Sequence, residues 1–373
     1  MAHLKSIKKL VCLQIIPSMG VGGIETGVRD MSSYLTSLKI NNYVLAENSS
    51  NNLDTNTSNI YFLKKLKFKN IFDQAKIKEL ILKIIQEKKI NLIHISSRAP
   101  AFFLINWIKK QGIKTVTSLH NTYNDQNFLK KYYNSFLLKG DSVISNSYFV
   151  SNYFHTNYNI KNQSIHIIPR GINTEYFDSD KKQKIQNKQN IKIFHPSRIS
   201  SWKGHILFLK YFAKLIKKSD MNFEVTIISN HNNKYEKEVD KIVQNLKISN
   251  HVHFIKPTKN IKELYMKANL VINSSVNPEG FGRTICESLS MRTPVIAPNM
   301  GGTKEQLEKF DNNLLYEIDN FDSFKKSFYY ALKNQDTISE KGRDFVIKNY
   351  SSNQMCFALL EIYNGILNEH ISN

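Results

Sequence analysis

The apolar and polar residues of this chain follow two periods that alternate along its length. Short, nearly continuous apolar runs such as residues 11–16 and 270–273 have the length of buried strands. Longer stretches such as 71–89 place isoleucines and leucines at helical spacing, with lysines between them. This alternation predicts an α/β protein in which helices cover parallel sheets.

These elements fit two domains. The predicted strands include residues 11–16, 92–95, 115–119, 191–196, 223–228, 252–255, 270–273 and 294–297. The predicted helices include residues 71–89, 236–246 and 353–367, and a helix that opens at the glycine-rich turn 19–25 and runs to about residue 38. A length of 373 residues suits two domains of ordinary size. We place them at residues 1–178 and 191–350, joined by a polar linker at 179–190 and followed by a terminal segment at 351–373.

Candidate chemistry is concentrated in residues 277–288, between two apolar runs. Gly280 and Gly282 leave backbone N–H groups open at the start of a predicted helix, where the helix dipole favours an anion or a group of hydroxyls. Glu279 and Glu287 are eight positions apart, a little over two helical turns, so both can point into one site. The alternative is an ordinary helix with one acid at its positive end and a second acid in solvent.

Two cations follow the predicted strand 191–196. Arg198 and Lys203 belong to the loop after this strand, where open α/β sheets bind their ligands. Two positive charges on such a loop can stabilise a departing pyrophosphate in place of a metal ion. The alternative is a pair of exposed cations without a ligand.

Further candidates lie at strand ends in the first half of the chain. Gly22 and Gly23 form a turn that is neither the Walker loop nor the dinucleotide-binding pattern, so it either admits a ligand or is only a tight turn. Arg98 follows strand 92–95 and binds an anionic acceptor group or pairs with an acid of the sheet. His120 follows strand 115–119, and a single histidine there is usually structural.

These motifs resemble the signature of family 4 retaining glycosyltransferases, also called glycosyl transferases group 1. The residues that carry the resemblance are Pro278, Glu279, Gly280, Phe281, Gly282, Glu287, residues 294–297, Gly301, Gly302 and Glu305. The resemblance covers nearly the whole chain and is strongest over residues 191–306. It implies the GT-B fold, with two facing Rossmann-like domains and a C-terminal helix that crosses back to the first domain.

The chain departs from the family pattern where glycine is usual, at Asn121, Ser197, Lys256, Pro257 and Arg292. The loop at 256–257 would frame the nucleotide base, so the base is left open. An arginine in a left-handed helix cap is unfavourable by about 1 kcal/mol. We therefore expect the helix before Arg292 to end with a different cap.

The resemblance also implies a role for each candidate residue. The residues that it assigns to catalysis are Glu279, His120, Arg198 and Lys203. The residues that it assigns to the donor are Gly22, Gly23, Arg198, Lys203, Ile255, Glu279, Gly280, Phe281, Gly282, Arg283 and Glu287. Within this set, Glu287 would bind the nucleotide ribose, the two cations the diphosphate, and Glu279 the transferred sugar. Arg98 would bind the acceptor on the first domain.

The resulting prediction is a retaining glycosyltransferase that moves a sugar from a nucleotide-diphosphate-sugar donor to an acceptor hydroxyl. Residues 94–100 and the Gly-Gly-Ile-Glu corner resemble enzymes of bacterial lipopolysaccharide or capsule assembly, which implies a lipid-linked glycan as acceptor. The prediction requires no metal or other cofactor, because Arg198 and Lys203 can take the place of a metal ion on the leaving diphosphate. The Asp-x-Asp pattern at residues 178–180 falls at the predicted linker and is interpreted as accidental. The alternative is a catalytically silent GT-B protein that binds a sugar nucleotide.

The net charge of +21 introduces a further alternative, a basic protein that binds nucleic acid. Only seven of the 52 basic residues are arginines, and the excess of lysine accompanies many asparagines and isoleucines, as an AT-rich genome would encode. If lysine has replaced arginine wherever it could, the arginines that remain mark positions where a planar guanidinium matters. Five of the seven fall in segments chosen on other grounds: Arg29, Arg98, Arg170, Arg198 and Arg283. Since no known DNA- or RNA-binding module is present, we expect no nucleic-acid partner.

Cysteine usage and hydropathy bear on location. Cys12, Cys286 and Cys356 are far apart in the sequence, which favours a reducing compartment. The apolar run after residues 1–9 is too short for a signal peptide, and no run approaches the roughly 20 residues of a membrane span. We expect a cytoplasmic protein. The basic segment 63–69 either contacts anionic lipid on the cytoplasmic face of the inner membrane or is a solvated loop.

Overall fold

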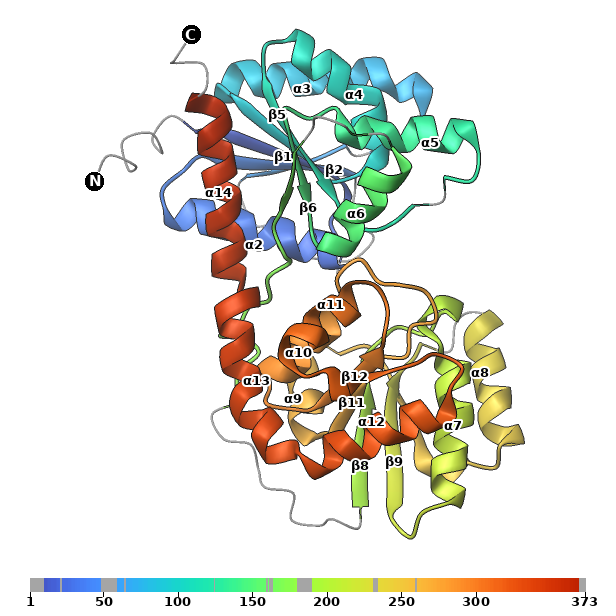
Figure 1. Cartoon of the computed structure of the whole chain (residues 1–373). Coiled ribbons are helices and arrows are strands. Elements are labelled where there is room, and N and C mark those ends of the chain that lie inside the picture. Colours follow the sequence, from blue (N-terminus) through green and yellow to red (C-terminus); the bar gives the residue numbers. More distant parts are fainter. Residues whose placement is uncertain are drawn as a thin grey trace. The chain divides into compact units, whose positions relative to one another are not determined.

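The protein divides into two compact units, which are described separately (Figure 1). The structure is a computed structural model and describes residues 10–20, 22–47, 59–63, 65–123, 125–158, 160, 164–179, 190–230, 234–258 and 260–368. Unit 1 comprises Met1–Gly171 and Ser352–Asn373, and unit 2 comprises Ile172–Ser351. Most of the predicted linker at 179–190 lies outside the described residues.

Unit 1 is built, within the described residues, on a seven-stranded parallel sheet in the order β3-β2-β1-β4-β5-β6-β7. The strands are β1 (Cys12–Ser18), β2 (Asn42–Glu47), β3 (Ile60–Phe62), β4 (Leu92–Ile95), β5 (Lys114–Leu119), β6 (Ser142–Ser145) and β7 (Ile165–Ile167). The chain adds strands outward from β1 on one side and from β4 on the other. The carboxyl ends of these two strands therefore form the topological switch point, where such sheets bind ligands.

Helices cover both faces of this sheet. They are α2 (Gly23–Ser37), η1 (Ile71–Asp73), α3 (Gln74–Lys88), α4 (Arg98–Lys110), α5 (Phe128–Ser135), η2 (Phe136–Leu138), α6 (Tyr148–Asn157) and α14 (Ser352–Asn368). Ile81 of α3, Leu104 of α4 and Phe136 of η2 share one buried cluster. Met31 of α2 and Leu359 of α14 belong to another. The chain's last helix is thus part of the core of unit 1.

Unit 2 contains a six-stranded parallel sheet in its described residues, in the order β10-β9-β8-β11-β12-β13. The strands are β8 (Asn190–His195), β9 (Asn222–Ile228), β10 (Val252–Ile255), β11 (Leu270–Ile272), β12 (Val295–Pro298) and β13 (Leu315–Tyr316). The helices are η3 (Ser201–Lys203), α7 (His205–Lys217), α8 (Lys234–Asn245), η4 (Ser249–His251), α9 (Ile261–Lys267), α10 (Arg283–Ser290), α11 (Gly301–Phe310), η5 (Asn312–Leu314), α12 (Phe321–Lys333) and α13 (Gln335–Tyr350). A single buried cluster joins these helices to the sheet.

The predicted fold class is confirmed, since both units have parallel sheets that alternate with helices. The expectation about Arg292 is wrong, because this residue has a φ of +56° and does adopt the left-handed conformation after α10. Its carbonyl oxygen accepts a hydrogen bond from Ser339 Oγ at 2.7 Å, and its Nε donates to the carbonyl oxygen of Ser179 at 3.3 Å. These contacts offset the cost of the strained backbone.

In the part of the chain that the structure describes, no helix is long and apolar enough to cross a membrane.

Candidate functional site

The loop that carries Arg198 and Lys203 begins at the carboxyl end of β8 and returns through η3 into α7. Gly204 makes this return with a φ of +69°, and a Cβ atom here would collide with the carbonyl oxygen of Ser274. Only glycine fits such a position. Ser274 Oγ donates to the carbonyl oxygen of Lys203 at 2.8 Å, which fixes the loop to the end of β11.

Lys203 and Glu279 come from different loops and form a mostly buried ion pair, with Nζ 2.8 Å from Oε1. The same carboxylate oxygen accepts hydrogen bonds from Asn273 Nδ2 at 2.9 Å and Ser275 Oγ at 2.5 Å. Burial by itself would raise the pKa of Glu279, but the charge of Lys203 and these hydrogen bonds outweigh it and hold the pKa below its usual value. Glu279 is therefore ionised at neutral pH.

Arg198 and Lys203 line a common pocket at the carboxyl edge of the unit 2 sheet. The other lining residues are Ile199, Ser200, Trp202, Ile228, Ser229, Asn230, Glu236 and Pro257. The backbone N–H of Ser229 donates to the carbonyl oxygen of Ile255 at 2.8 Å, so the predicted donor residue Ile255 adjoins this pocket through the backbone. Two cations and the loop after β10 thus meet at one edge of the sheet.

Glu287 is buried in α10, and both its carboxylate oxygens have donors. Arg283 Nε lies 3.1 Å from Oε1, and the Tyr265 hydroxyl donates to Oε2 at 2.8 Å. Burial and the charge of Glu287 raise the pKa of Tyr265 well above its usual value, so its hydroxyl remains a donor. Asn273 donates to Thr284 Oγ1 at 3.0 Å in the first turn of α10, besides its bond to Glu279. Asn273 therefore links Glu279 to the first turn of α10, the helix that carries Glu287.

The glycine loop before α10 is fixed by the start of α11. The backbone N–H of Gly302 donates to the carbonyl oxygen of Glu279 at 2.7 Å. A Cβ atom on Gly302 would lie only 2.5 Å from the carbonyl oxygen of Gly280, so glycine is required for this approach. Gly282 has a φ of +82°, and the buried ring of Phe281 packs against Tyr350. Phe281 therefore offers a ligand its backbone and not its ring.

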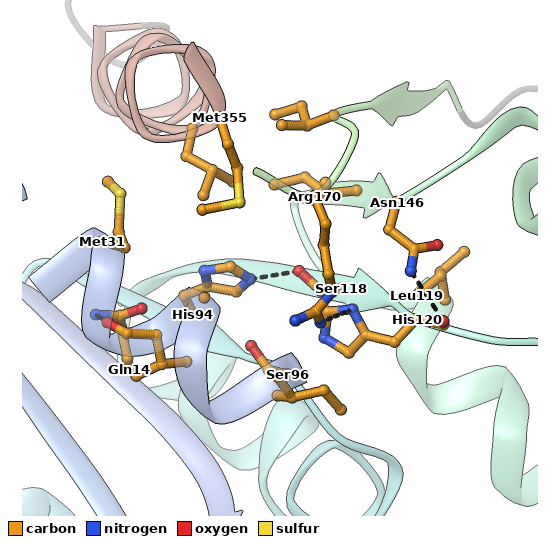
Figure 2. Close-up of a pocket in the computed structure, with 16 residues that line it drawn as sticks. Gln14, Met31, His94, Ser96, Ser118, Leu119, His120, Asn146, Arg170 and Met355 are labelled. Atoms are coloured by element: carbon orange, nitrogen blue, oxygen red, sulfur yellow. Dashed lines mark hydrogen bonds between the residues drawn. The ribbon is translucent and has the colours of Figure 1, made fainter. Parts of the chain in front are cut away.

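Unit 1 has its own polar cluster at the carboxyl end of β5, shown in Figure 2. His120 Nδ1 lies 2.9 Å from Arg170 Nη2, while His120 Nε2 is buried and has no hydrogen-bond partner among the described residues. Burial, with the charge of Arg170, lowers the pKa of His120 well below its usual value, so the ring is neutral. Because a guanidinium can only donate, Nδ1 is the acceptor and Nε2 carries the proton.

Arg170 also connects His120 to the glycine turn, because its Nη1 donates to the carbonyl oxygen of Gly23. Gly22 precedes it and begins α2 as the N-cap. The sequence analysis noted Arg170 as a retained arginine and did not foresee its contact with His120. The scarcity of arginine in the chain and the resemblance of residues 165–173 to a family motif were the signals that pointed to Arg170.

A cavity of unit 1 lies beside this cluster, between the sheet, α2 and α14, and its lining includes His94, Ser118 and His120 (Figure 2). His94 Nε2 is 2.6 Å from Ser118 Oγ, and His94 Nδ1 is 2.6 Å from the hydroxyl of Tyr363 in α14. Burial lowers the pKa of His94 to about 4. In the sequence, His94 was assigned to a strand and to the segment 94–100, without a role of its own.

Arg98 begins α4 and makes no hydrogen bond to His120 within the described residues, although both contact Tyr123. Its Nη1 donates to Asn134 Oδ1 at 3.2 Å, and its guanidinium carbon lies 4.3 Å from the centroid of the Tyr123 ring. Of the Asp-x-Asp pattern, Asp178 pairs with Arg343 Nη2 at 2.9 Å, and Asp180 lies outside the described residues.

The predicted site residues thus fall into two groups. In unit 2 the structure brings together Arg198, Lys203, Glu279, Gly280, Phe281, Gly282, Arg283 and Glu287 on adjoining loops and one helix. In unit 1 it brings together Gly23 and His120 through Arg170. The sequence analysis missed the supporting residues Asn273, Ser275 and Tyr265, although Asn273 stands at a strand end, where polar residues serve ligands.

Two α/β units with parallel sheets, and a last helix that returns to unit 1, are the architecture of the GT-B fold. The family model for glycosyl transferases group 1 matches residues 177–351, and that for Glycosyltransferase Family 4 matches residues 21–176. The chain therefore belongs to the family 4 glycosyltransferases, which are also called glycosyl transferases group 1. No curated protein sequence matches it significantly.

Solved structures of similar fold agree with this assignment. A glycosyltransferase from Rickettsia africae ESF-5 is 30% identical with a TM-score of 0.84, and the match covers 96% of this chain and 98% of that one. Anabaena Alr3699/HepE, solved in complex with UDP and glucose, is 18% identical with a TM-score of 0.77, covering 95% and 99%. WaaG, a glycosyltransferase involved in lipopolysaccharide biosynthesis, is 12% identical with a TM-score of 0.73, covering 95% and 100%. The last two matches bear on the fold alone.

Proposed function

We propose that this protein transfers a sugar from a nucleotide-diphosphate-sugar donor to an acceptor hydroxyl, with retention of anomeric configuration and without a metal ion. The observation that carries the proposal is the Lys203–Glu279 ion pair of 2.8 Å at the edge of a pocket that Arg198 also lines. Cations and a carboxylate held side by side suit a ligand with a diphosphate next to a sugar.

In this proposal Arg198 and Lys203 bind the donor diphosphate. Breaking the bond between the anomeric carbon and the diphosphate builds negative charge on the leaving group, and cations already in place stabilise that charge. The acceptor hydroxyl loses its proton as the new glycosidic bond forms, and in this proposal an oxygen of the leaving diphosphate accepts it. The N–H groups at the start of α10 add the positive end of a helix dipole.

The carboxylates would bind the two sugars. Glu279 is ionised, and its Oε2 keeps lone pairs for hydroxyls of the transferred sugar. Glu287 accepts one donor on each oxygen, which leaves acceptor capacity for the ribose hydroxyls. His120 has a proton on Nε2 and would donate it to an oxygen of the transferred sugar. Gly22 and Gly23 would allow the ligand to approach the backbone, and Arg98 would bind the acceptor.

For the acceptor we propose a lipid-linked glycan of lipopolysaccharide or capsule assembly. WaaG, which has the same fold, is described as acting in lipopolysaccharide biosynthesis. The net charge of +21 suits work beside an anionic membrane surface in the cytoplasm.

A panel of UDP-, GDP- and ADP-sugars tests the donor, beginning with UDP-glucose, which HepE binds in its solved complex. We expect one sugar nucleotide to raise the melting temperature and to be consumed when an acceptor is present. Consumption should vanish in Glu279→Ala, while binding of the free nucleoside diphosphate persists. Stabilisation without consumption would mean a silent sugar-nucleotide-binding protein, and no stabilisation by any donor would contradict the proposal.

Two further measurements on the same reaction test retention of configuration and independence of a metal ion. The H1–H2 coupling constant of the product in an NMR spectrum gives its anomeric configuration, and we expect it to match the donor. Turnover should persist in excess EDTA. An inverted product, or loss of activity restored by a divalent cation, would overturn the corresponding part of the proposal.

A further inference from the structure

An apolar ridge on α5 projects from unit 1 into solvent. We define the α5 ridge as Phe128, Leu129 and Tyr132, whose side chains are 79%, 75% and 51% exposed. The rings of Phe128 and Tyr132 stack one turn apart, with centroids 6.5 Å from each other. Three large, exposed apolar side chains on a helix of eight residues are unusual at a water-exposed surface and indicate an interaction site.

Lysines surround this ridge. Lys130 and Lys131 belong to the same helix and are exposed, and no acid occurs in α5. Lys139 follows η2, with its Nζ 3.6 Å from the Phe136 ring centroid and 6.0 Å from that of Tyr132. Asp125, the nearest acid before the helix, is hydrogen-bonded to Tyr153. The ridge therefore combines apolar side chains with lysines on a helix that has no acid of its own.

A second exposed apolar pair lies at the same edge of the sheet. We define the η1 pair as Ile71 and Phe72, which are 68% and 88% exposed. η1 stands between the carboxyl end of β3 and the start of α3, as α5 follows the carboxyl end of β5. Helices α3 and α4 and the η2 turn after α5 share one buried cluster, so both features lie on one face of the sheet. Lys69 is exposed next to the η1 pair.

We propose that the α5 ridge and the η1 pair dock unit 1 on the surface of an anionic phospholipid bilayer. The apolar side chains would enter the boundary between headgroups and acyl chains, and the lysines would bind headgroup phosphates. The same edge of the sheet carries Arg98 and His120, so docking would hold this edge close to a membrane-bound acceptor. The inference goes beyond the proposed transfer, since docking requires neither donor nor acceptor.

The experiment measures flotation of the full chain with phosphatidylcholine vesicles, with and without phosphatidylglycerol, and without sugar nucleotide. Wild type should float with the anionic vesicles and much less with neutral ones. Phe128→Ser/Leu129→Ser should weaken binding at least about tenfold, since two apolar side chains no longer insert. The matched control Phe357→Ser replaces an exposed phenylalanine of α14 and should bind as wild type does.

Charge is tested separately. Lys130→Glu/Lys131→Glu should abolish the preference for anionic vesicles, whereas Lys237→Glu/Lys241→Glu, which changes net charge equally on exposed positions of α8, should not. In Phe128→Trp, brominated acyl chains should quench the fluorescence beyond the quenching seen in wild type.

Three results would overturn the inference: no binding of wild type to anionic vesicles, equal binding of the ridge variant, or no added quenching in Phe128→Trp. Loss of transfer to a water-soluble acceptor in Phe128→Ser/Leu129→Ser, with vesicle binding intact, would place the ridge in the acceptor site and also overturn it. Stabilisation by the donor, measured on the same preparations, reports on the proposed reaction independently of docking.

Discussion

At the scale of single residues, the site of unit 2 depends on a carboxylate that is kept charged inside the protein. Glu279 is ionised because Lys203, Asn273 and Ser275 all direct donors at one of its oxygens. In the absence of Lys203 the carboxylate would remain buried without its counter-charge, which is far more costly than losing both partners. In the proposed function, this ion pair is a preformed half of the donor site.

Lys203→Met should lower the free energy of unfolding by an amount on the order of 3 kcal/mol at pH 7, because it strands the Glu279 carboxylate. Lys203→Met/Glu279→Gln should recover most of this loss while remaining inactive. Urea unfolding measures both, with Lys241→Met, an exposed lysine, as control. Equal stability of Lys203→Met and wild type would show that the pair contributes nothing.

Buried histidines should make the protein sensitive to acid. Burial lowers the pKa of His94 and of His205 to about 4, from a usual value of 6.5. Above pH 6.5 both rings are neutral in the folded and unfolded chains, and below it the unfolded chain takes up protons that the folded chain refuses. Stability is thus lost as pH falls from 6.5 to 4, by roughly 3 kcal/mol per histidine.

The check is urea unfolding over that pH range. In His94→Gln the decline should be smaller than in wild type by roughly 3 kcal/mol, although the variant is less stable at pH 7. His155→Gln, at an exposed position of α6, should leave the decline unchanged. A decline in His94→Gln as steep as that of wild type would refute the assignment.

At the scale of elements, the start of α11 holds the glycine loop in place. Gly302→Ala would put a methyl group 2.5 Å from the carbonyl oxygen of Gly280 and 2.7 Å from Phe281 Cα, so the loop must move. We expect a loss of about 1–3 kcal/mol in stability and a larger loss of donor turnover. Gly365→Ala is the control, because its Cβ in α14 meets no other atom.

Thermal unfolding followed by circular dichroism measures the stability of both variants, and turnover of the donor measures their activity. Gly365→Ala should keep full activity and gain about 0.5–1 kcal/mol from helix propensity. Wild-type activity in Gly302→Ala would mean that the loop tolerates displacement and does not need its fixed backbone.

Helices and strands were the features of the structure that the sequence predicted best. The spacing of apolar residues predicts strands such as β4 and β10 and the helix α14, because the side chains that pack in the core must recur with the period of the strand or helix. The cap at Arg292 was not predictable, since the hydrogen bonds of Ser339 and Ser179 that hold it come from distant segments. The partners of Glu279 and His120 were missed for the same reason. Local sequence shows which residue ends a strand and not which neighbour reaches it.

At the scale of the whole molecule, the chain leaves unit 1 after Gly171 and returns to it at Ser352. α14 contributes six buried side chains to unit 1: Met355, Cys356, Leu359, Leu360, Tyr363 and Ile366. At about 2 kcal/mol each, their burial is on the order of 10 kcal/mol, which is comparable with the stability of an entire domain.

Deletion of residues 352–373 should therefore unfold unit 1 and spare unit 2. Amide hydrogen exchange reports on the two units separately. Peptides from residues 10–171 should lose protection from exchange, while peptides from residues 190–351 should keep it. Phe357→Ser, which alters an exposed side chain of the same helix, should preserve protection in both. Intact protection of unit 1 in the truncated chain would mean that α14 is dispensable for its core.

The most direct test of the site is calorimetric titration of two ligands, the stabilising sugar nucleotide and its free nucleoside diphosphate, into wild type, Arg198→Ala and Glu279→Gln. If Arg198 binds the diphosphate and Glu279 the transferred sugar, Arg198→Ala should weaken both ligands at least about tenfold, while Glu279→Gln should weaken only the sugar nucleotide. Wild-type affinity of both variants for both ligands would contradict the account.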